Sequence, residues 1–585
     1  MKDLHTPVLI VGGGPAGLVM SLLLREFGVE ALVIERRDGM PALPKAHIIN
    51  QRSVEILHEA GVGAALRAVG SPHENMVSVA WYTSFAGPAP LHARELGRVD
   101  AWGGGAQLAE HQAASPYYTT NLAQMKLEPI LLARLREVAP DAILLNHEVT
   151  TFEDHGDGVR ARVVDCATGE EFSVDADYLV GADGGRTVGD VLGIELLGQR
   201  DLVRMVSAHI TADLSAVNPD PGASMYWFVN PDKGASLDSG NLVKIGGRGW
   251  GADSDEWVFN LGKQVDDPVE IGEDYFVDHV RRALNLPELD VTVHRVSQWN
   301  IESVIATSFS RGRVHLIGDA AHRNPPTGGL GLNGGIADAH NLAWKLALVL
   351  AGKAGTSLLD TYEAERKPVV IRNAEQSLES FAQISLVDEA LGLDRELTAE
   401  QRWAQVAELF SDSDEGRVMR KRVDAATAAR RHEFMAQNLQ IGYSYESGAL
   451  VPDGSALRVG ADDVTDYVAT TRPGHRVPHA WVERGGMVTS TFVLGRSGRF
   501  LLIVGTEGEI WRGAAARLAP AIVDVVGIGA GQEWTDRDGA WAAQREVSES
   551  GAVLVRPDQH VAWRAEDAVP DPAAVLADVL RTVLF

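Results

Sequence analysis

The sequence predicts an α/β fold in which a parallel-sheet domain is interleaved with a β-rich module and followed by a separate C-terminal α/β domain. The first observation behind this prediction is a strand–glycine turn–helix–strand pattern at the start of the chain. The second is a pair of segments rich in Trp, Tyr, Val and Thr, which interrupt the glycine-rich and helical segments. The third is a charge-rich helical stretch after residue 397, beyond which mixed α/β patterns return.

The chain opens with a β-α-β unit. Residues 8–11 form a continuous apolar run, residues 15–27 have helical periodicity, and residues 31–34 form a second apolar run. Between the first strand and the helix, residues 12–17 match G-x-G-x-x-G. Glu35 ends the second strand and would accept hydrogen bonds from ribose hydroxyls. A glycine turn in this full context indicates a Rossmann-type dinucleotide-binding domain.

Each residue of this turn has a physical role. Gly12 permits the tight turn, Gly14 allows a pyrophosphate to approach the backbone, and Gly17 lets the helix and strand pack closely. The helix that begins with Pro15 and Ala16 offers free N–H donors and the positive end of its dipole. The turn therefore predicts a phosphate-binding site.

Two further glycine turns follow predicted buried strands at 178–181 and 314–317. The first is Ala-Asp-Gly at 182–184, and the second is a longer run at 318–333 that leads into a helix. Asp319 is placed to bind a polyol hydroxyl. Backbone N–H groups at a helix N-terminus would also stabilise the negative charge that a flavin gains on reduction. A nicotinamide ring has no such requirement, so the second turn favours FAD over NAD(P) as the bound dinucleotide.

The remaining chain is divided by changes in pattern. Residues 225–229 and 242–245 read as antiparallel strands, whereas residues 121–139 read as a helix. A charge-rich stretch at 399–438 is either a solvated helix face or a partner site. In the C-terminal part, residues 500–504 and 553–555 are strand candidates. The predicted domains are an FAD-binding domain (1–72, 121–186 and 300–396), a β-rich substrate domain (73–120 and 187–299), a helical connection (397–444) and a C-terminal domain (445–585).

Composition limits the functional classes. The chain has 585 residues, 53 Lys+Arg against 80 Asp+Glu and a net charge of −27, which argues against nucleic acid or an anionic membrane as the main partner. Its single cysteine, Cys166, excludes an internal disulfide and a thiolate metal cluster. We expect no metal site, no signal peptide and no membrane span, and hence a cytoplasmic protein that could form a homo-oligomer.

The three glycine motifs together resemble those of the single-component FAD-dependent aromatic hydroxylases, the relatives of para-hydroxybenzoate hydroxylase and phenol hydroxylase. They read G-x-G-x-x-G, A-D-G and G-D-A-A-H-x-x-P-P-x-x-G-x-G-x-N. Residues 44–52 are most similar to the dichlorophenol hydroxylase subgroup. Residues 474–479, 551–558 and 561–564 resemble the thioredoxin-like tail of the phenol hydroxylase branch, so the resemblance spans nearly the whole chain. Without a cysteine, such a tail cannot exchange disulfides.

The resemblance implies a set of cofactor-binding residues, with Pro325 and Pro326 near the isoalloxazine ring. After Asp183 the family often has a serine and further basic residues, and this chain departs from that pattern at Arg186. Gln124 corresponds to a family glutamine near the ribityl chain and phosphates, although a lone glutamine on a helix could equally be a surface residue. The implied FAD-binding residues are Gly12, Gly14, Pro15, Ala16, Gly17, Glu35, Arg36, Arg52, Gln124, Asp183, Asp319, Pro326, Gly331, Leu332 and Asn333.

The resemblance also implies a reaction cycle. NADPH or NADH binds transiently and reduces FAD, the reduced flavin adds O2 to give a C4a-hydroperoxide, and the distal oxygen passes to an electron-rich aromatic ring. A phenol must be deprotonated or hydrogen-bonded to react well. His47 falls where phenol hydroxylase carries a catalytic aspartate, and a histidine that titrates near neutrality suits this role. A structural role for His47 is an equal alternative.

Two aromatic residues are further candidates. Tyr226 and Trp227 lie on a predicted substrate-domain strand and could line the pocket or belong to the core. The predicted function is an FAD-dependent monooxygenase that hydroxylates a phenol-like or hydroxylated heteroaromatic ring. The alternatives are another NAD(P)-linked oxidoreductase and a non-catalytic flavin-bound protein that sequesters a ligand.

Overall fold

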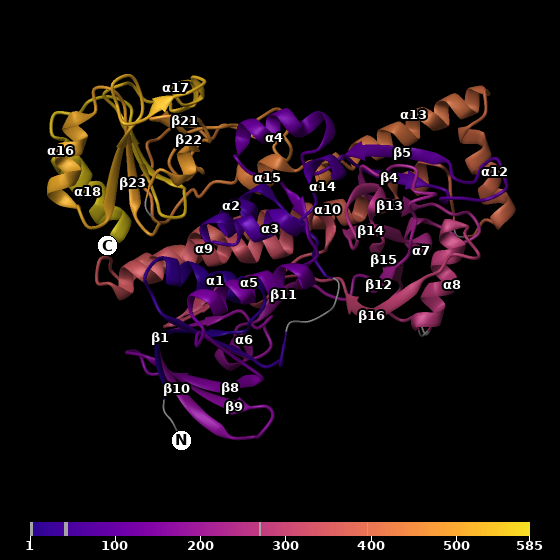
Figure 1. Cartoon of the computed structure of the whole chain (residues 1–585), viewed down its shortest axis with the longest axis horizontal. Coiled ribbons are helices and arrows are strands. Elements are labelled where there is room, and N and C mark those ends of the chain that lie inside the picture. Colours follow the sequence, from indigo (N-terminus) through magenta and orange to yellow (C-terminus); the bar gives the residue numbers. More distant parts are fainter. Residues whose placement is uncertain (1–3, 40–44, 268, 270, 395, 496) are drawn as a thin grey trace.

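The computed structural model describes the chain except for residues 1–3, 40–44, 268, 270, 395 and 496. Pro44, the first residue of the run at 44–52, therefore lies outside the described residues. The α/β prediction is confirmed. The C-terminal domain and a seven-stranded β-rich sheet lie at opposite ends of the molecule, with the Rossmann-type domain between them (Figure 1).

The central domain is built on a sheet with the order β18-β19-β10-β1-β2-β7. Strand β1 pairs in parallel with both β10 and β2, as expected for buried apolar strands joined by helices. The main helices against this sheet are amphipathic or buried and share one large apolar cluster with the strands. The elements are β1 (Leu4–Val11), α1 (Pro15–Glu26), β2 (Ala31–Glu35), α5 (Gln124–Val138), β7 (Ile143–Leu145), β10 (Glu171–Gly181), β18 (Ser310–Arg311), β19 (Val314–Leu316) and α9 (Leu330–Leu350).

The β-rich sheet has the order β16-β12-β15-β14-β13-β4-β5. Two of its strands, β4 and β5, precede helix α5 of the central domain in the sequence, and the other five follow that helix. The strands are β4 (Ser78–Tyr82), β5 (Glu95–Asp100), β12 (Arg204–Thr211), β13 (Ala223–Phe228), β14 (Asn241–Gly246), β15 (Glu256–Lys263) and β16 (Thr292–Asn300). The predicted strands at 225–229 and 242–245 correspond to β13 and β14.

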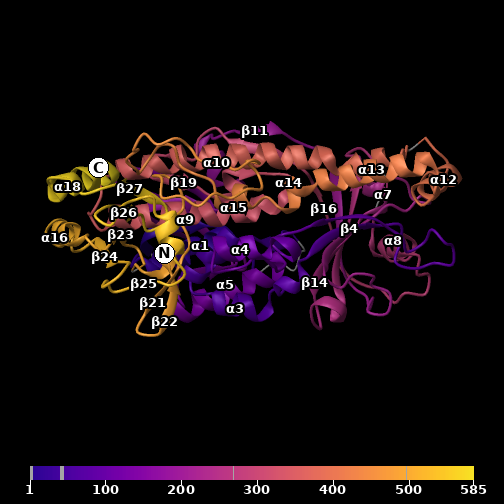
Figure 2. The ribbon, with the colours of Figure 1, turned by 90° about the horizontal axis from the view of Figure 1, so that it is seen from above.

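Long helices connect these parts. Helix α10 (Ser357–Ala382) runs along the long axis of the molecule beside α9 (Figure 2). The charge-rich stretch at 399–438 is not one helix, because it is broken into shorter ones by Ser413 and Arg430. These are α12 (Ala399–Leu409), α13 (Asp414–Ala429), α14 (Arg431–Phe434) and α15 (Gln437–Ile441). None of the helices in the described part of the chain has the length and apolar character needed to cross a bilayer.

The C-terminal part contains a four-stranded sheet with the order β24-β23-β26-β27. Strands β23 and β24 are parallel, whereas β26 and β27 are antiparallel additions. Its core includes Trp344 and Leu358, which belong to α9 and α10, so this domain packs directly on the helices of the central domain. The thioredoxin-like assignment stays a prediction. The elements are β23 (Phe500–Val504), α16 (Glu509–Leu518), β24 (Val523–Gly527), β26 (Ala552–Val555), β27 (Val561–Ala565) and α18 (Pro572–Leu584).

Candidate active site

The first glycine turn has the geometry of a dinucleotide cradle. Gly12 has φ +109°, and a Cβ there would lie 2.4 Å from the carbonyl oxygen of Ala182. A Cβ on Gly17 would lie 2.1 Å from the carbonyl oxygen of Gly12. At Gly14, by contrast, an added Cβ meets no heavy atom within 4 Å, and no side chain caps the N-terminus of α1. Open space above free N–H donors is what a pyrophosphate requires.

The second glycine turn brings the start of α9 to the start of α1. A Cβ built on Gly335 would lie 3.3 Å from the Cβ of Ala16, so the N-terminal parts of the two helices converge. Helix α9 begins after Gly329, which has φ +65° and no side-chain cap. Along the loop, Pro326 is exposed, and Gly331 and Leu332 are half-buried. The two N-termini can therefore serve the two ends of one dinucleotide.

A cavity of about 550 Å³ adjoins this second turn. The exposed Asp319 and the half-buried Gly331 contribute to its wall, as do residues of the edge strand β16 of the β-rich sheet. Its lining residues are Arg204, Gln298, Trp299, Asn300, Glu302, Asp319, Arg323, Asn324 and Gly331. The converging helix ends and this polar cavity fit FAD, and the contact of Asp319 with the ribityl chain stays a prediction.

Several predicted cofactor residues already have partners within the protein. Glu35 accepts from the backbone N–H of Gly13 at 2.7 Å and of Arg37 at 3.0 Å. Asp183 accepts from three backbone N–H groups of its own turn, at residues 185, 187 and 188. Both carboxylates therefore shape the cradle, and their direct contact with FAD stays a prediction. Arg36 is exposed. Burial lowers the pKa of Arg186, and Arg36, Arg37 and Asp183 lie close enough to that guanidinium to affect its pKa as well.

Asn333 and Gln124 position neighbouring segments. The Asn333 side chain accepts from the N–H of Asn50 at 3.1 Å and donates to the carbonyl of Ile48 at 3.0 Å, which ties α9 to the segment that carries His47. Gln124 donates to Glu128 at 2.7 Å, and burial raises the pKa of that carboxyl. Lys45 lies near enough to Glu128 to affect it, a basic neighbour of this helix end that the sequence analysis missed.

Arg52 binds residues of the C-terminal domain, and its predicted contact with FAD stays a prediction. Its guanidinium donates to Glu55 at 2.8 Å, to the side chain of Gln559 at 2.6 Å and to the carbonyl of Asp558 at 2.7 Å. The second terminal nitrogen also lies 3.2 Å from His340. The physical reason is that α2 (Gln51–Glu59) turns this residue toward the C-terminal domain.

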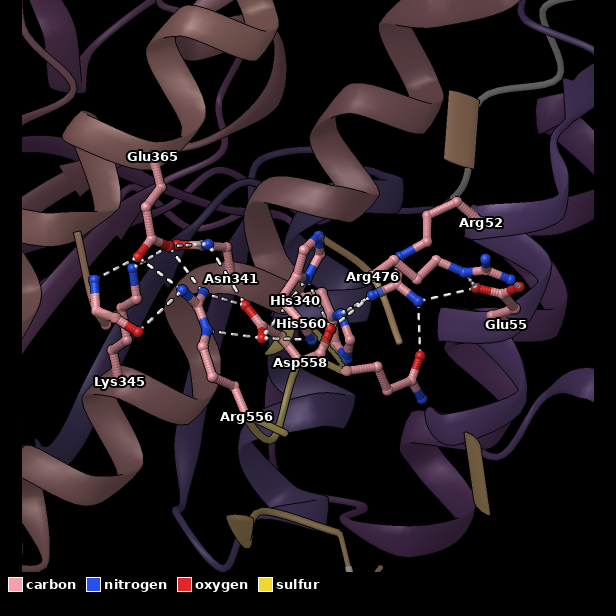
Figure 3. A network of polar contacts seen from close by, with 12 residues as sticks. Arg52, Glu55, His340, Asn341, Lys345, Glu365, Arg476, Arg556, Asp558 and His560 are labelled. Carbon is pink, nitrogen blue, oxygen red and sulfur yellow. Dashed lines mark hydrogen bonds and ion pairs between the residues drawn. The ribbon is translucent and has the colours of Figure 1, made fainter. Parts of the chain in front are cut away.

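Arg52 belongs to a buried polar network that joins the two domains (Figure 3). Arg476 of the C-terminal domain binds both carboxylate oxygens of Glu55, at 3.0 and 2.6 Å. Arg556 likewise binds both oxygens of Glu365, each at 2.8 Å, and pairs with Asp558. We call this set, with Lys345, the interdomain network.

His47 is held in place by backbone pairing. Strand β3 (Ile48–Ile49) pairs with β6 (Thr120–Asn121), and the His47 carbonyl accepts from the N–H of Leu122 at 2.7 Å. Its Nδ1 is buried and has no hydrogen-bond partner among the described residues. Burial lowers its pKa to about 4, an effect that Asn121 partly offsets. The prediction that His47 titrates near neutrality is therefore wrong, because the folded chain favours the uncharged imidazole.

Tyr226 and Trp227 lie on opposite faces of β13, so they cannot both line one pocket. The Tyr226 hydroxyl donates to Asn218 at 2.8 Å, and the ring is fully buried in the core of the β-rich domain. This burial favours the core alternative for Tyr226 over a place in the substrate pocket. Trp227 instead belongs to an apolar cluster that also contains Ile48 and Trp102. The Trp102 ring in turn contacts His47, so this side of the sheet faces His47. Its indole Nε1 is buried without a partner among the described residues.

Comparisons with known proteins agree along the whole chain. An FAD binding domain model matches residues 5–377, and an aromatic-ring hydroxylase C-terminal model matches residues 470–584. The 2,4-dichlorophenol 6-monooxygenase of Cupriavidus pinatubonensis is 35% identical, over 99% of this chain and 96% of that protein. The tetracenomycin A2 monooxygenase-dioxygenase of Streptomyces glaucescens is 34% identical, over 100% and 98% respectively.

Solved structures are similar as well. The flavin-dependent monooxygenase PieE, crystallised with FAD and substrate, matches with a TM-score of 0.93 and 40% identity over 100% of both chains. Aklavinone-11 hydroxylase, crystallised with FAD and aklavinone, matches with a TM-score of 0.79 and 31% identity over 100% of both chains.

Proposed function

The chain belongs to the FAD-dependent aromatic-ring hydroxylases and is a flavin-dependent monooxygenase, and from this premise we propose that it hydroxylates a phenol-like or hydroxylated heteroaromatic ring beside His47. Of the relatives named above, one is named for 2,4-dichlorophenol and one for tetracenomycin A2, and a third was crystallised with aklavinone. The observation that carries the proposal is the unpartnered, buried Nδ1 of His47 at the end of the segment that Asn333 ties to the start of α9.

Bound FAD supplies the redox chemistry, taking electrons from NAD(P)H and activating O2. The N-terminus of α1 would hold its pyrophosphate, and the N-terminus of α9 would hold its flavin end. Asp319 is the proposed ligand of the ribityl chain. The helix dipole of α9 stabilises negative charge at this end of the cofactor.

His47 acts on the substrate through a neutral ring. With a pKa of about 4, the imidazole is uncharged at pH 7 and can accept a hydrogen bond from a phenol O–H at Nδ1. That hydrogen bond polarises the phenol toward phenolate, which is the better nucleophile. Full proton transfer then depends on how far the bound substrate stabilises the imidazolium.

We further propose that the seven-stranded sheet is the substrate domain, with the boundaries predicted above. The sheet face that bears Trp227 shares an apolar cluster with Ile48 and with Phe434, and most other members of this cluster outside the sheet belong to the helical segment at 384–434. An aromatic ring bound there would be shielded from water, as the chemistry of a reactive oxygen species requires.

One experiment tests the reaction. The FAD-loaded protein is incubated with NAD(P)H, ¹⁸O2 and a panel of phenols, and NAD(P)H consumption and product mass are measured. We expect stimulated consumption and one ¹⁸O atom in the product. No stimulation by any phenol of the panel, or product without the label, would overturn the proposal.

A second experiment tests His47. His47→Ala should keep FAD and its reduction by NAD(P)H, but hydroxylated product per NAD(P)H should fall, with H2O2 making up the difference. Removing a group that assists proton transfer typically lowers the reaction rate about 10²–10⁴-fold. This rate defect should shrink as the pH approaches the pKa of the phenol. His279→Ala is the control, because burial also lowers that pKa to about 4, on α8 (Glu273–Leu284). Wild-type coupling at every pH would make His47 structural.

A further inference from the structure

Trp102 has an unusual backbone for a bulky residue. Its φ is +47°, in the left-handed region that large side chains rarely adopt. Residues in that region persist where surrounding structure enforces them, and they gather at ligand sites. Here the enforcement is visible, because the Trp102 N–H donates to the carbonyl of Phe434 at 2.7 Å.

The glycines that follow fix this geometry. A Cβ on Gly103 would lie 2.3 Å from the His111 ring, and a Cβ on Gly104 would lie 2.2 Å from the carbonyl oxygen of Met76. The loop therefore packs closely against His111 and Met76. Trp102 itself is buried, with only 5% of the residue exposed.

That orientation places the indole against His47. The two ring centroids are 6.2 Å apart, with an interplanar angle of 84°. The indole Nε1 is buried and has no hydrogen-bond partner among the described residues, as is also true of His47 Nδ1 and Trp227 Nε1. Three unpartnered polar atoms in one apolar region are expected to be satisfied by a ligand, because a buried polar group without a partner is costly.

The chemistry of the missing partner follows from the atoms. An indole N–H can only donate, so its partner must be an acceptor. Arg430, which lies over the Phe434 ring, is paired with Glu433 and adds no net charge. The site therefore favours a neutral acceptor over a carboxylate.

Building on the proposed function, we infer that Trp102 is a specificity-determining residue whose indole N–H donates to a neutral oxygen, carbonyl or ether, on the aromatic substrate. The preferred substrate is thus a ring that carries both the hydroxyl recognised by His47 and a second, neutral oxygen. Trp227 offers another indole donor from the β-rich sheet for a more highly oxygenated ring.

Three pairs of phenols test the inference: 2-, 3- and 4-methoxyphenol, each against the ethylphenol of the same substitution pattern. Each pair exchanges one ether oxygen for a methylene at nearly constant shape. The measured quantity is kcat/KM for substrate-stimulated NAD(P)H consumption by the FAD-loaded enzyme. In the wild type, the methoxy member of at least one pair should be favoured by about 2- to 10-fold, the effect of one neutral hydrogen bond.

Trp102→Phe keeps an aromatic ring and removes the N–H, so it should abolish that preference. Trp81→Phe is the control, because Trp81 is also buried and packs on the same Phe434 ring, at 6.5 Å. The preference should survive in that variant. A wild type without preference in any pair, or a preference that Trp102→Phe retains, would overturn the inference while leaving the proposed function intact. If neither member of any pair stimulates NAD(P)H consumption by the wild type, the proposed function and the inference built on it both fail.

Discussion

Replacing Glu365 with glutamine probes the interdomain network at its most connected carboxylate. Glu365 is fully buried and accepts five hydrogen bonds, from Asn341, Lys345, the N–H of Ala449, and two nitrogens of Arg556. Whichever oxygen becomes an amide NH2, that group faces at least two existing donors. The substitution also leaves Lys345 without its carboxylate partner, while Arg556 keeps only Asp558.

The magnitude follows from these losses. Removing one partner of a buried ion pair costs about 3–5 kcal/mol, a large part of the roughly 5–15 kcal/mol that stabilises a native protein. Burial already lowers the pKa of Lys345 to about 8, and Glu365 opposes that shift. In the variant the folded-state pKa of Lys345 falls further below its unfolded value of about 10.4. The cost should therefore be greatest at low pH and shrink as pH rises toward 8, where the lysine is already neutral in the folded variant.

The assay is urea unfolding of the FAD-loaded protein at pH 6, 7 and 8, followed by tryptophan fluorescence. Glu363→Gln is the matched control, because Glu363 lies on the same helix, is partly exposed and pairs with Lys367. It should cost about 1 kcal/mol or less. A Glu365→Gln variant as stable as this control, or one whose deficit grows with pH, would refute the reasoning.

Three further predictions concern the cofactor site and acid stability. Asp319→Ala should weaken FAD binding by about 1.5–3 kcal/mol, measured by flavin fluorescence titration, and unchanged affinity would remove Asp319 from the site. Gly14→Ala should leave the stability of the apoprotein unchanged but lower its FAD affinity. Gly17→Ala should destabilise the apoprotein itself, because only the Cβ at this second position collides with backbone. Equal thermal shifts of the two apoprotein variants would contradict this prediction. Burial lowers the pKa of eight described histidines, His47 and His560 among them, to about 4. Stability should therefore hold above pH 6.5 and fall steeply from pH 6.5 to 4, because the unfolded chain binds protons that the folded chain excludes; a constant urea midpoint from pH 7 to 5 would oppose it.

The sequence predicted those features that depend on local pattern. The apolar runs at 8–11 and 31–34 lie within β1 and β2, because continuous apolar stretches of that length fit buried parallel strands. The glycine turn at 12–17 could be interpreted because it follows a strand, opens a helix and precedes a strand that ends in Glu35. The FAD cofactor and the monooxygenase class followed from the three motifs together.

The features that local pattern could not reveal depend on tertiary contacts. Tyr226 and Trp227 are both aromatic, so alternation along the strand could not show which one faces the core. The lowered pKa of His47 arises from burial by segments far away in the sequence. Arg52 meets Asp558 across a separation of 506 residues, a pairing that no local signal announces. Trp102 could not be identified from the sequence because its left-handed backbone leaves no local pattern, although the glycines at 103–105 were a usable clue.

Helix α9 connects the C-terminal domain to the turn that we propose holds the flavin end of FAD. Its 21 residues span about 31 Å, with Asn333 in the first turn and Lys345 near the other end. The C-terminal domain holds the far end through Lys345's partner Glu365 and through Arg556. Exchanging this domain between relatives would therefore change the contacts that position α9, the helix whose opposite end is the proposed binding site of the flavin. A chimera that keeps its catalytic properties would have to transfer both sides of the contact, Glu55 with Arg476 and Glu365 with Arg556, as one unit.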